Sequence, residues 1–441
     1  MISRKDIDLY LVDITVHLDI LGYSIVLPIM ASLNESLGGD VDDLSLLFSS
    51  YAVTQFISYL YMGQLSDRIG RKPLIVLSLL GSSLGAVAQG LSRSITALIV
   101  FRCITGLFAG SWIVAQAYIA DCTTTEERPK YLARLEAFLA AAYIFGPALG
   151  GFLGQITYGT PFIAAGIIAG IALIFVCFCL NESLDTKAVQ KKSNPKKEKK
   201  PRQCRRMFPI VVVILVDTIN AKILCMIVEF CNRWQINGWD SYFNSYAQET
   251  FGLKELHFSF LVTGLGILSC VLNVLVIPFL IFNLNMPIPY ISLMAGFFQC
   301  ISVVSNLIMG LSKSLPGAMF GSFLMEIGYS LSTSAPSSII SSYSDASVQG
   351  EVLSYNMMAG QIAMICAPLA MAQLSKHKLN TPFLVSGCFG LIVVICMFWI
   401  SRTPGGKMLG RTSREELENS KSQSNSNSDI ELASAKEWIV C

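Results

Sequence analysis

The sequence is dominated by apolar stretches that are long enough to cross a lipid bilayer. Hydrophobic residues make up 53% of the 441 residues and charged residues only 14%, whereas a soluble domain carries about 25% charged residues. In lipid, backbone amides must be hydrogen-bonded within their own segment, which favours helices of about 20 residues. We therefore predict an all-α membrane protein with twelve transmembrane helices, at about residues 8–30, 44–62, 73–92, 95–120, 132–155, 161–181, 208–230, 258–282, 288–311, 315–340, 352–374 and 382–401.

A polar segment divides the chain into two halves. Residues 182–207 are rich in lysine and contain two prolines, and we interpret them as a basic, flexible cytoplasmic linker. They separate a six-helix bundle at 1–181 from a second one at 208–401. Duplicated halves of this kind hold their substrate between them near the middle of the membrane. Residues 402–441 are polar and rich in Ser and Asn, which predicts a disordered cytoplasmic tail.

The distribution of basic residues predicts the orientation. Lys and Arg concentrate in the segments that are cytoplasmic if both termini lie in the cytoplasm, including the linker and the tail. The segments expected on the outer side contain only Arg93, Arg233, Lys254, Lys313, Lys376 and Lys378. We therefore expect a multi-pass membrane protein, a monomer with the lipid bilayer as its main partner, in the plasma membrane or an endomembrane. Binding to nucleic acid is not expected, because the basic linker is tethered between two spans.

Several short motifs occur in the first half of the chain. A charged turn between the second and third apolar stretches, residues 63–73, contains Gly63, Asp67, Arg68, Gly70, Arg71 and Lys72. The fourth stretch contains Arg102, Gly106 and Gly110, and the fifth contains Gly146, Pro147 and Gly150. Together with residues 18–28, these motifs resemble those of the major facilitator superfamily, most closely its tetracycline-exporter-like branch of drug:proton antiporters. The resemblance covers about residues 8–155 and implies the major facilitator fold.

The resemblance also implies a gating role for two of these motifs. The 63–73 turn is expected to latch the two halves on the inner side when the cavity opens outward. Asp67 is expected against the positive end of a neighbouring helix, and Arg71 and Lys72 near acids such as Asp121. Gly146 and Pro147 make the fifth helix bendable and allow close helix packing. The alternative is that the turn only anchors the topology.

Ionisable side chains inside the apolar stretches are candidates for proton coupling. Such groups are costly in lipid and therefore mark functional sites. The candidates are Asp19, Arg102, Asp217, Lys222 and Glu326. By resemblance, Arg102 faces the cavity and perturbs proton release from a nearby carboxylate. Lys222 is expected to pair with Glu229 or another of these acids across the cavity, although a purely structural ion pair is the alternative.

Other features of the sequence narrow the interpretation. Asp13 and His17 are four residues apart and can face each other on a helix. Neither residues 79–86 nor residues 288–311 contain an acid, which makes recognition of a tetracycline–metal complex doubtful. Most of the 13 cysteines lie in apolar spans and are expected to be packing residues, so no metal or cofactor is expected. Asn34 begins an Asn-Glu-Ser glycosylation pattern on the predicted outer side.

Three functions are compatible with these observations. The first is a secondary active transporter that moves a small organic solute by alternating access and is expected to be coupled to protons. The second is an uncoupled facilitator of a neutral solute, with Trp112, Gln116, Tyr118, Asn273 and Gln361 as possible lining residues. The third is a non-transporting membrane sensor or scaffold that signals through the linker and tail. An enzyme is not expected, because no paired nucleophile and base, phosphate loop or metal motif occurs.

Overall fold

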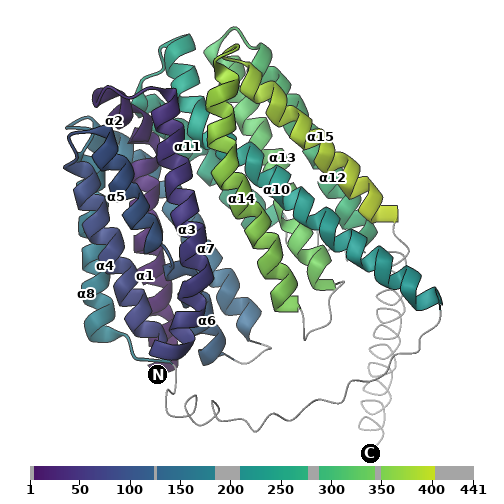
Figure 1. Ribbon diagram of the computed structural model, residues 1–441, viewed down its shortest axis with the longest axis horizontal. Helices are drawn as coiled ribbons and strands as arrows, with labels where there is room; N and C mark the ends of the chain where they lie inside the picture. Colours follow the sequence, from purple (N-terminus) through teal and green to yellow (C-terminus); the bar gives the residue numbers. More distant parts are fainter. Residues whose placement is uncertain (1–3, 124–126, 184–208, 277–287, 343–348, 403–441) are drawn as a thin grey trace, which may run out of the picture.

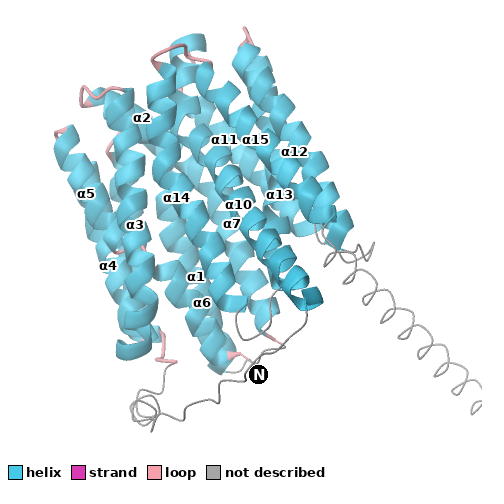
Figure 2. Ribbon diagram, turned by 45° about the vertical axis from the view of Figure 1, so that its right-hand side comes forward, coloured by secondary structure: helices cyan, strands magenta, loops and turns pink. Residues whose placement is uncertain are grey.

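The computed structural model describes residues 4–123, 127–183, 209–276, 288–342 and 349–402. Within these ranges the chain forms helices and no strand (Figure 2). The helices group into twelve rod-like segments that lie side by side in two sets of six (Figure 1). This confirms the predicted all-α fold of two six-helix bundles. Most of the predicted linker and nearly all of the predicted tail lie outside the described residues.

The first six segments form the N-terminal half, residues 4–183. The first segment is interrupted by a 3₁₀ turn at Leu27–Ile29, where Pro28 cannot donate a backbone hydrogen bond. The fourth segment is interrupted at residues 108–110. The helices of this half are α1 (Arg4–Val26), α2 (Met30–Ser36), α3 (Val41–Ile69), α4 (Arg71–Gly90), α5 (Ile95–Leu107), α6 (Ser111–Cys122), α7 (Arg128–Gly154) and α8 (Thr160–Cys179).

The second six segments form the C-terminal half, residues 209–402. The eighth segment, α11, continues into a short π-helix at Leu272–Val276. The helices of this half are α10 (Pro209–Phe251), α11 (Glu255–Val271), α12 (Ile288–Leu311), α13 (Leu315–Ser342), α14 (Gln349–Ser375) and α15 (Thr381–Arg402).

The seventh helix is longer than the sequence predicted. The hydropathy pattern predicted an end near residue 230, whereas α10 continues to Phe251. Apolar residues recur along the added part at the spacing of one helix face, at Trp239, Tyr242, Phe243 and Tyr246. The opposite face carries polar residues, which lower the average hydropathy, so the hydropathy pattern did not reveal this part of the helix. Arg233, predicted in an outer loop, therefore lies within α10.

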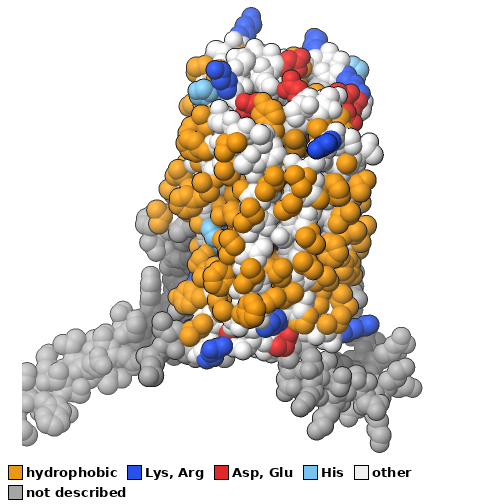
Figure 3. All heavy atoms as spheres, turned by 90° about the vertical axis from the view of Figure 1, so that its left-hand side faces the viewer, with side chains coloured by type: hydrophobic (Ala, Val, Ile, Leu, Met, Phe, Trp, Pro, Cys, Tyr) orange, Lys and Arg blue, Asp and Glu red, His pale blue; other side chains and the backbone are white. Residues whose placement is uncertain are grey.

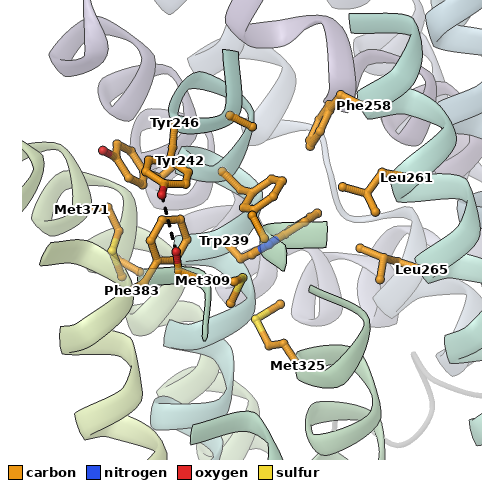
Figure 4. Packing of buried hydrophobic residues seen from close by; sticks show 14 of the residues in the cluster. Trp239, Tyr242, Tyr246, Phe258, Leu261, Leu265, Met309, Met325, Met371 and Phe383 are labelled. Atoms are coloured by element: carbon orange, nitrogen blue, oxygen red, sulfur yellow. Dashed lines mark hydrogen bonds between the residues drawn. The ribbon is translucent and has the colours of Figure 1, made fainter. Parts of the chain in front are cut away.

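The apolar face of α10 holds the core of the C-terminal half. Trp239 stacks on Phe243 with ring centroids 4.9 Å apart, and Tyr246 meets the ring of Phe383 at the same centroid distance. The Trp239 indole donates a hydrogen bond to Ser322 Oγ at 3.1 Å, which satisfies its buried N–H group. Figure 4 shows these side chains converging from α10, α11, α12, α13, α14 and α15. This cluster fixes α10 against its own half.

The outer surface matches a protein surrounded by lipid. Eight of the described segments are long and apolar enough to span a bilayer. Figure 3 shows apolar side chains covering the middle of one face and charged side chains gathered at its two ends. Large apolar side chains such as Phe178 of α8 and Trp399 of α15 are exposed on the outside of the two halves. In lipid such exposure carries no hydrophobic cost.

The two halves meet through α3 with α14 and through α7 with α11. We call the end of the molecule that carries residues 63–73 the turn end, and the opposite end the closed end. At the closed end α3 begins with a capping box, in which the Asp40 and Asp43 side chains and backbone amides bond reciprocally. Ser94 caps α5 at the same end.

Candidate functional site: a central interface sealed at one end

The charged turn forms a compact ion-pair cluster at the turn end. Arg71 is buried, and its Nε donates to Asp121 Oδ2 at 2.8 Å, so the expected contact between these residues is present. Its Nη1 lies 2.6 Å from Asp67 Oδ1 and 2.5 Å from Ser66 Oγ. All of these partners belong to the N-terminal half. The cluster thus ties α3, α4 and α6 together.

Glu182, which the sequence analysis did not single out, occupies the helix N-terminus expected for Asp67. Its carboxylate accepts hydrogen bonds from the backbone N–H groups of Arg71 at 2.8 Å and Lys72 at 3.0 Å. An anion at this position is stabilised by the helix dipole of α4. Gly70, with φ +116°, makes the turn possible, since a Cβ there would lie 2.5 Å from a Glu182 oxygen. Asp67 instead contacts Arg71 and is largely exposed.

The glycines around Pro147 allow α7 to lie against α1. A Cβ at Gly146 would lie 1.9 Å from Ser24 Oγ, and one at Gly150 would lie 2.0 Å from the Ile25 carbonyl oxygen. Ser24 Oγ also donates to the Ala142 carbonyl at 2.9 Å across this seam. These contacts explain the motif as a requirement for close packing. The structure describes a single state, so the gating role predicted for it stays a prediction.

The break in the fourth segment lets α6 begin next to the side chain of Asp19, which lies on α1. Ser111, the first residue of α6, donates a hydrogen bond to Asp19 Oδ2 at 2.5 Å, and Ser82 of α4 also interacts with this carboxylate. The carbonyls freed by the break accept hydrogen bonds from Tyr61 and Ser78. Asp19 is half-buried between α1, α4 and α6. It therefore has a built polar environment inside the membrane-spanning region.

Arg102 is buried against two tyrosine rings. Its guanidinium carbon lies 4.8 Å from the Tyr51 centroid and 5.9 Å from the Tyr23 centroid, and these rings stack on each other. Only 3% of the residue is exposed. Within the described residues Arg102 forms no ion pair, and its Nε has no hydrogen-bond partner. The described contacts of Arg102 are therefore cation–π contacts, and its predicted effect on a nearby carboxylate stays a prediction.

Asp240 of α10 faces the same tyrosines from the other half and was missed by the sequence analysis. It lines a small cavity of about 20 Å³, room for about one water molecule. The walls come from both halves: Tyr23 and Tyr51 on one side, and Asn237, Met364 and Pro368 on the other. Asp240 also interacts electrostatically with buried Glu326, which accepts a hydrogen bond from Ser330 at 2.8 Å.

Arg233 and Glu229 form an ion pair on the polar face of α10. Arg233 Nε donates to Glu229 Oε1 at 2.8 Å; the Arg233 side chain is 43% exposed and the Glu229 side chain 7%. Lys222 has no acidic partner among the described residues, so the pairing predicted between Lys222 and Glu229 is wrong. Asp217 lies on α10, in a part whose side chains lie outside the described residues.

Other predicted sites are also corrected. Asn34 is buried, at 3% exposure, and its amide donates to the Asp40 carbonyl at 2.8 Å, so it cannot present an accessible amide for glycosylation. Asp13 forms an ion pair with Arg134 at 2.5 Å instead of contacting His17. His17 Nδ1 lies 2.7 Å from the Phe138 carbonyl oxygen. These side chains therefore join α1 to α7.

The lining residues proposed for a neutral solute do not form a path together. Tyr118 is buried in the core of the N-terminal half, and its hydroxyl donates to the Asn181 carbonyl at 2.8 Å. Asn273 donates to the Ser269 carbonyl at 2.9 Å on its own helix. Among the described residues no group of three or more His, Cys, Asp or Glu side chains could hold a metal ion.

Hydrogen bonds between the halves occur near the closed end. Lys376 contacts Asp42, and Gln373 Nε2 donates to the same Asp42 carboxylate at 3.3 Å. Further contacts across the halves are Ser49 Oγ to the Ile365 carbonyl at 2.8 Å, Asn244 Nδ2 to the Pro28 carbonyl at 3.1 Å, Gln248 Nε2 to Glu35 at 3.0 Å and Tyr158 to Glu255 at 3.4 Å. The Glu255 carboxylate raises the pKa of Tyr158. These six contacts between described residues of the two halves all lie toward the closed end.

Comparisons with known proteins agree with this architecture. The family model described as Major Facilitator Superfamily matches residues 13–305 and 290–436. The class C tetracycline resistance protein of Escherichia coli is 33% identical over 172 residues, which cover 38% of this chain and 43% of that protein. The class D protein of Salmonella ordonez is 24% identical over 388 residues, 86% of this chain and 94% of that protein.

A solved structure shows the same fold. A bacterial homologue of the human lysosomal transporter Spinster, in an inward-facing and unoccupied conformation, superposes with a TM-score of 0.72. It is 14% identical, and the match covers 91% of this chain and 98% of that one. At this identity the likeness concerns the fold alone.

Proposed function

Because the chain belongs to the Major Facilitator Superfamily, we propose that it transports a small organic solute, coupled to protons, by alternating access. The observation that carries this proposal is the interface between the two halves, which contains ionisable groups and whose described hydrogen bonds lie near the closed end. Hydrogen bonds link the halves at the closed end, while Asp19, Glu229 and Arg233 lie deeper toward the turn end. Ionisable groups at such a depth mark ion and solute pathways.

The turn end is the cytoplasmic end in this proposal. The support is the basic composition of residues 182–207, which follow directly from this end, because basic loops stay in the cytoplasm. The described conformation then opens toward the cytoplasm. The 63–73 turn would meet the C-terminal half when this end closes, and the exposed carboxylate of Asp67 is available for that contact.

Asp19 is the proposed proton-carrying group of the N-terminal half. Its carboxylate accepts a hydrogen bond from Ser111 of α6 and interacts with Ser82 of α4 within the spanning region. Ser111 and Ser82 can hydrogen-bond the ionised or the protonated carboxyl group. Proton binding and release at Asp19 can thus proceed without loss of its hydrogen-bonding environment.

Reconstituted full-length protein tests the proposal. We would impose a pH gradient across proteoliposomes and follow three radiolabelled probes: tetraphenylphosphonium, tetracycline and benzoate. The expected result is gradient-dependent accumulation of at least one probe, which Asp19→Asn converts into equilibration without accumulation. An uncoupled facilitator would move its probe equally with and without the gradient and would keep its rate in Asp19→Asn. That result would contradict proton coupling.

A further inference from the structure

We propose that the solute carries an anionic group, such as a carboxylate, and that Arg233 is the residue that binds it. This inference rests on the proposed transport function and names the chemical class of its substrate. The first observation is that two arginines lie in the central interface with opposite accessibility. Arg102 is 3% exposed and covered by two tyrosine rings, whereas the Arg233 side chain is 43% exposed.

Arg233 faces the space between the halves and not the lipid. At about 1.5 Å per residue along α10, it lies roughly 27 Å from the closed end of the helix. Its electrostatic neighbours come from both halves: Glu136 and Tyr143 of α7, Tyr59 of α3 and Tyr329 of α13. A side chain that has neighbours on three other helices from both halves and is still 43% exposed faces the interface between the halves, where charged groups within membranes are expected.

The ion pair with Glu229 orients Arg233 and leaves part of its guanidinium group free. Glu229 uses the Nε edge of the guanidinium. Within the described residues the two Nη groups have no hydrogen-bond partner. Gly360 of α14 makes room for the pair, because a Cβ there would lie 3.0 Å from Arg233 Cγ and 3.3 Å from Glu229 Oε1. A fixed, planar pair of donors matches the two oxygens of a carboxylate.

Glu136 makes anion binding at Arg233 depend on pH. It is exposed, lies on α7 across the interface and interacts electrostatically with Arg233. A bound anion and an ionised Glu136 compete for the same positive charge. Binding of the anion is therefore favoured when Glu136 is protonated. The other groups that face Arg233 are Glu229, which is already paired, and the hydroxyl groups of Tyr59, Tyr143 and Tyr329.

Thermal unfolding of the purified full chain tests the site with probes of matched size. Benzoate, benzyl alcohol and benzylamine differ mainly in charge, and at a given concentration a ligand of the native state raises Tm more the more tightly it binds. We expect benzoate alone to raise Tm, with an affinity at least about tenfold weaker in Arg233→Gln. Arg93→Gln, at an exposed closed-end position, should bind benzoate like the wild type. An equal shift with the alcohol or the amine, or an unchanged shift in Arg233→Gln, would overturn the proposal.

A second variant keeps the test decisive if Arg233→Gln does not fold. Between about pH 5.5 and about pH 8 benzoate stays ionised, so a change in its affinity reports on the protein. The wild type should bind benzoate more weakly as the pH rises, and Glu136→Gln should bind it equally well across this range. If Glu136→Gln keeps the wild-type pH dependence, Glu136 is not the competing group and the proposal fails.

The outcomes separate this inference from the proposed function. If a pH gradient drives transport of tetraphenylphosphonium or tetracycline but benzoate neither binds nor moves, the transport function stands and the anion site is wrong. If benzoate binds through Arg233 but no gradient drives its movement, the site stands and proton-coupled transport is wrong.

Discussion

The two ends of the molecule use charged residues in different ways. At the turn end Arg71 contacts Asp67 and Asp121, and all three lie within the N-terminal half. At the closed end Lys376 and Asp42 come from opposite halves. One end therefore uses its charges to stabilise a single half, and the other uses them to join two. The ion pair that the structure describes between the halves thus lies at the closed end.

A cross-link across the closed end should have the largest effect. With Asp42→Cys and Lys376→Cys joined by a short bifunctional thiol reagent, the halves cannot separate there, and transport should be lost completely. Thr157→Cys with Thr160→Cys is the matched control, because these hydroxyls lie 2.7 Å apart at the same end but within one half. Proteoliposome uptake measures both. Full transport in the cross-linked first pair would show that closed-end separation is not required.

A methyl group at Gly150 should weaken the seam between α1 and α7. The added Cβ would lie 2.0 Å from the Ile25 backbone oxygen, which cannot move without distorting α1, and such overpacking costs about 1–3 kcal/mol. Gly63→Ala is the control: its Cβ would find only Ile113 Cγ2, at 3.8 Å, and should stabilise helix α3 by about 0.5–1 kcal/mol. The midpoint of denaturation should fall in Gly150→Ala and rise in Gly63→Ala. A similar shift in both variants would contradict the packing argument.

Loss of the Arg71 side chain should lower stability without changing the closed end. Arg71→Gln removes charged hydrogen bonds to Asp67 and Asp121, at a cost of about 2 kcal/mol. Because these contacts lie within one half, thiol labelling at the closed end should keep its wild-type rate. A labelling change there, measured on a single cysteine placed at residue 376, would mean that the turn and the closed end are coupled in this state.

The ion pair at the closed end should contribute least to stability. Asp42 and Lys376 are both largely exposed, and such pairs are worth below about 1 kcal/mol. Asp42→Asn should therefore leave the unfolding temperature almost unchanged but increase labelling of the closed-end interface by thiol reagents. Added salt should produce the same increase in the wild type, since exposed charges are screened. If neither Asp42→Asn nor added salt changes the labelling rate, the ion pair between Asp42 and Lys376 does not hold the two halves together at this end.

The sequence predicted the helical architecture better than the site. Long apolar runs report directly on lipid, so the two six-helix bundles were predictable. The second half of α10 was missed because residues facing the interface, such as Arg233 and Asp240, interrupt the hydropathy. Those same residues form the candidate site. Charged residues spaced along one face opposite Trp239 and Phe243 are the signal that could have revealed both.

Pairings across the bundle were less predictable than element positions. Arg71 and Asp121 were linked through their opposite charges, whereas Glu182 follows an apolar run and gives no local sign that it meets the start of α4. Arg102 was predicted to act on a nearby carboxylate, and only the fold shows that the rings of Tyr51 and Tyr23 lie against it. Tertiary contacts between residues far apart in sequence decide such partners.

The interruption at residues 108–110 has a mechanical consequence. Tyr61 of α3 donates a hydrogen bond to the Leu107 carbonyl, and Ser78 of α4 donates one to the Phe108 carbonyl. Because these bonds hold the end of α5 from two sides, α5 and α6 cannot bend freely at the interruption. The N-terminal half should move as a rigid body, and the displacement between states must be taken up at its seams with α11 and α14. Tyr61→Phe removes one of these hydrogen bonds and should allow α5 and α6 to bend relative to each other within that half.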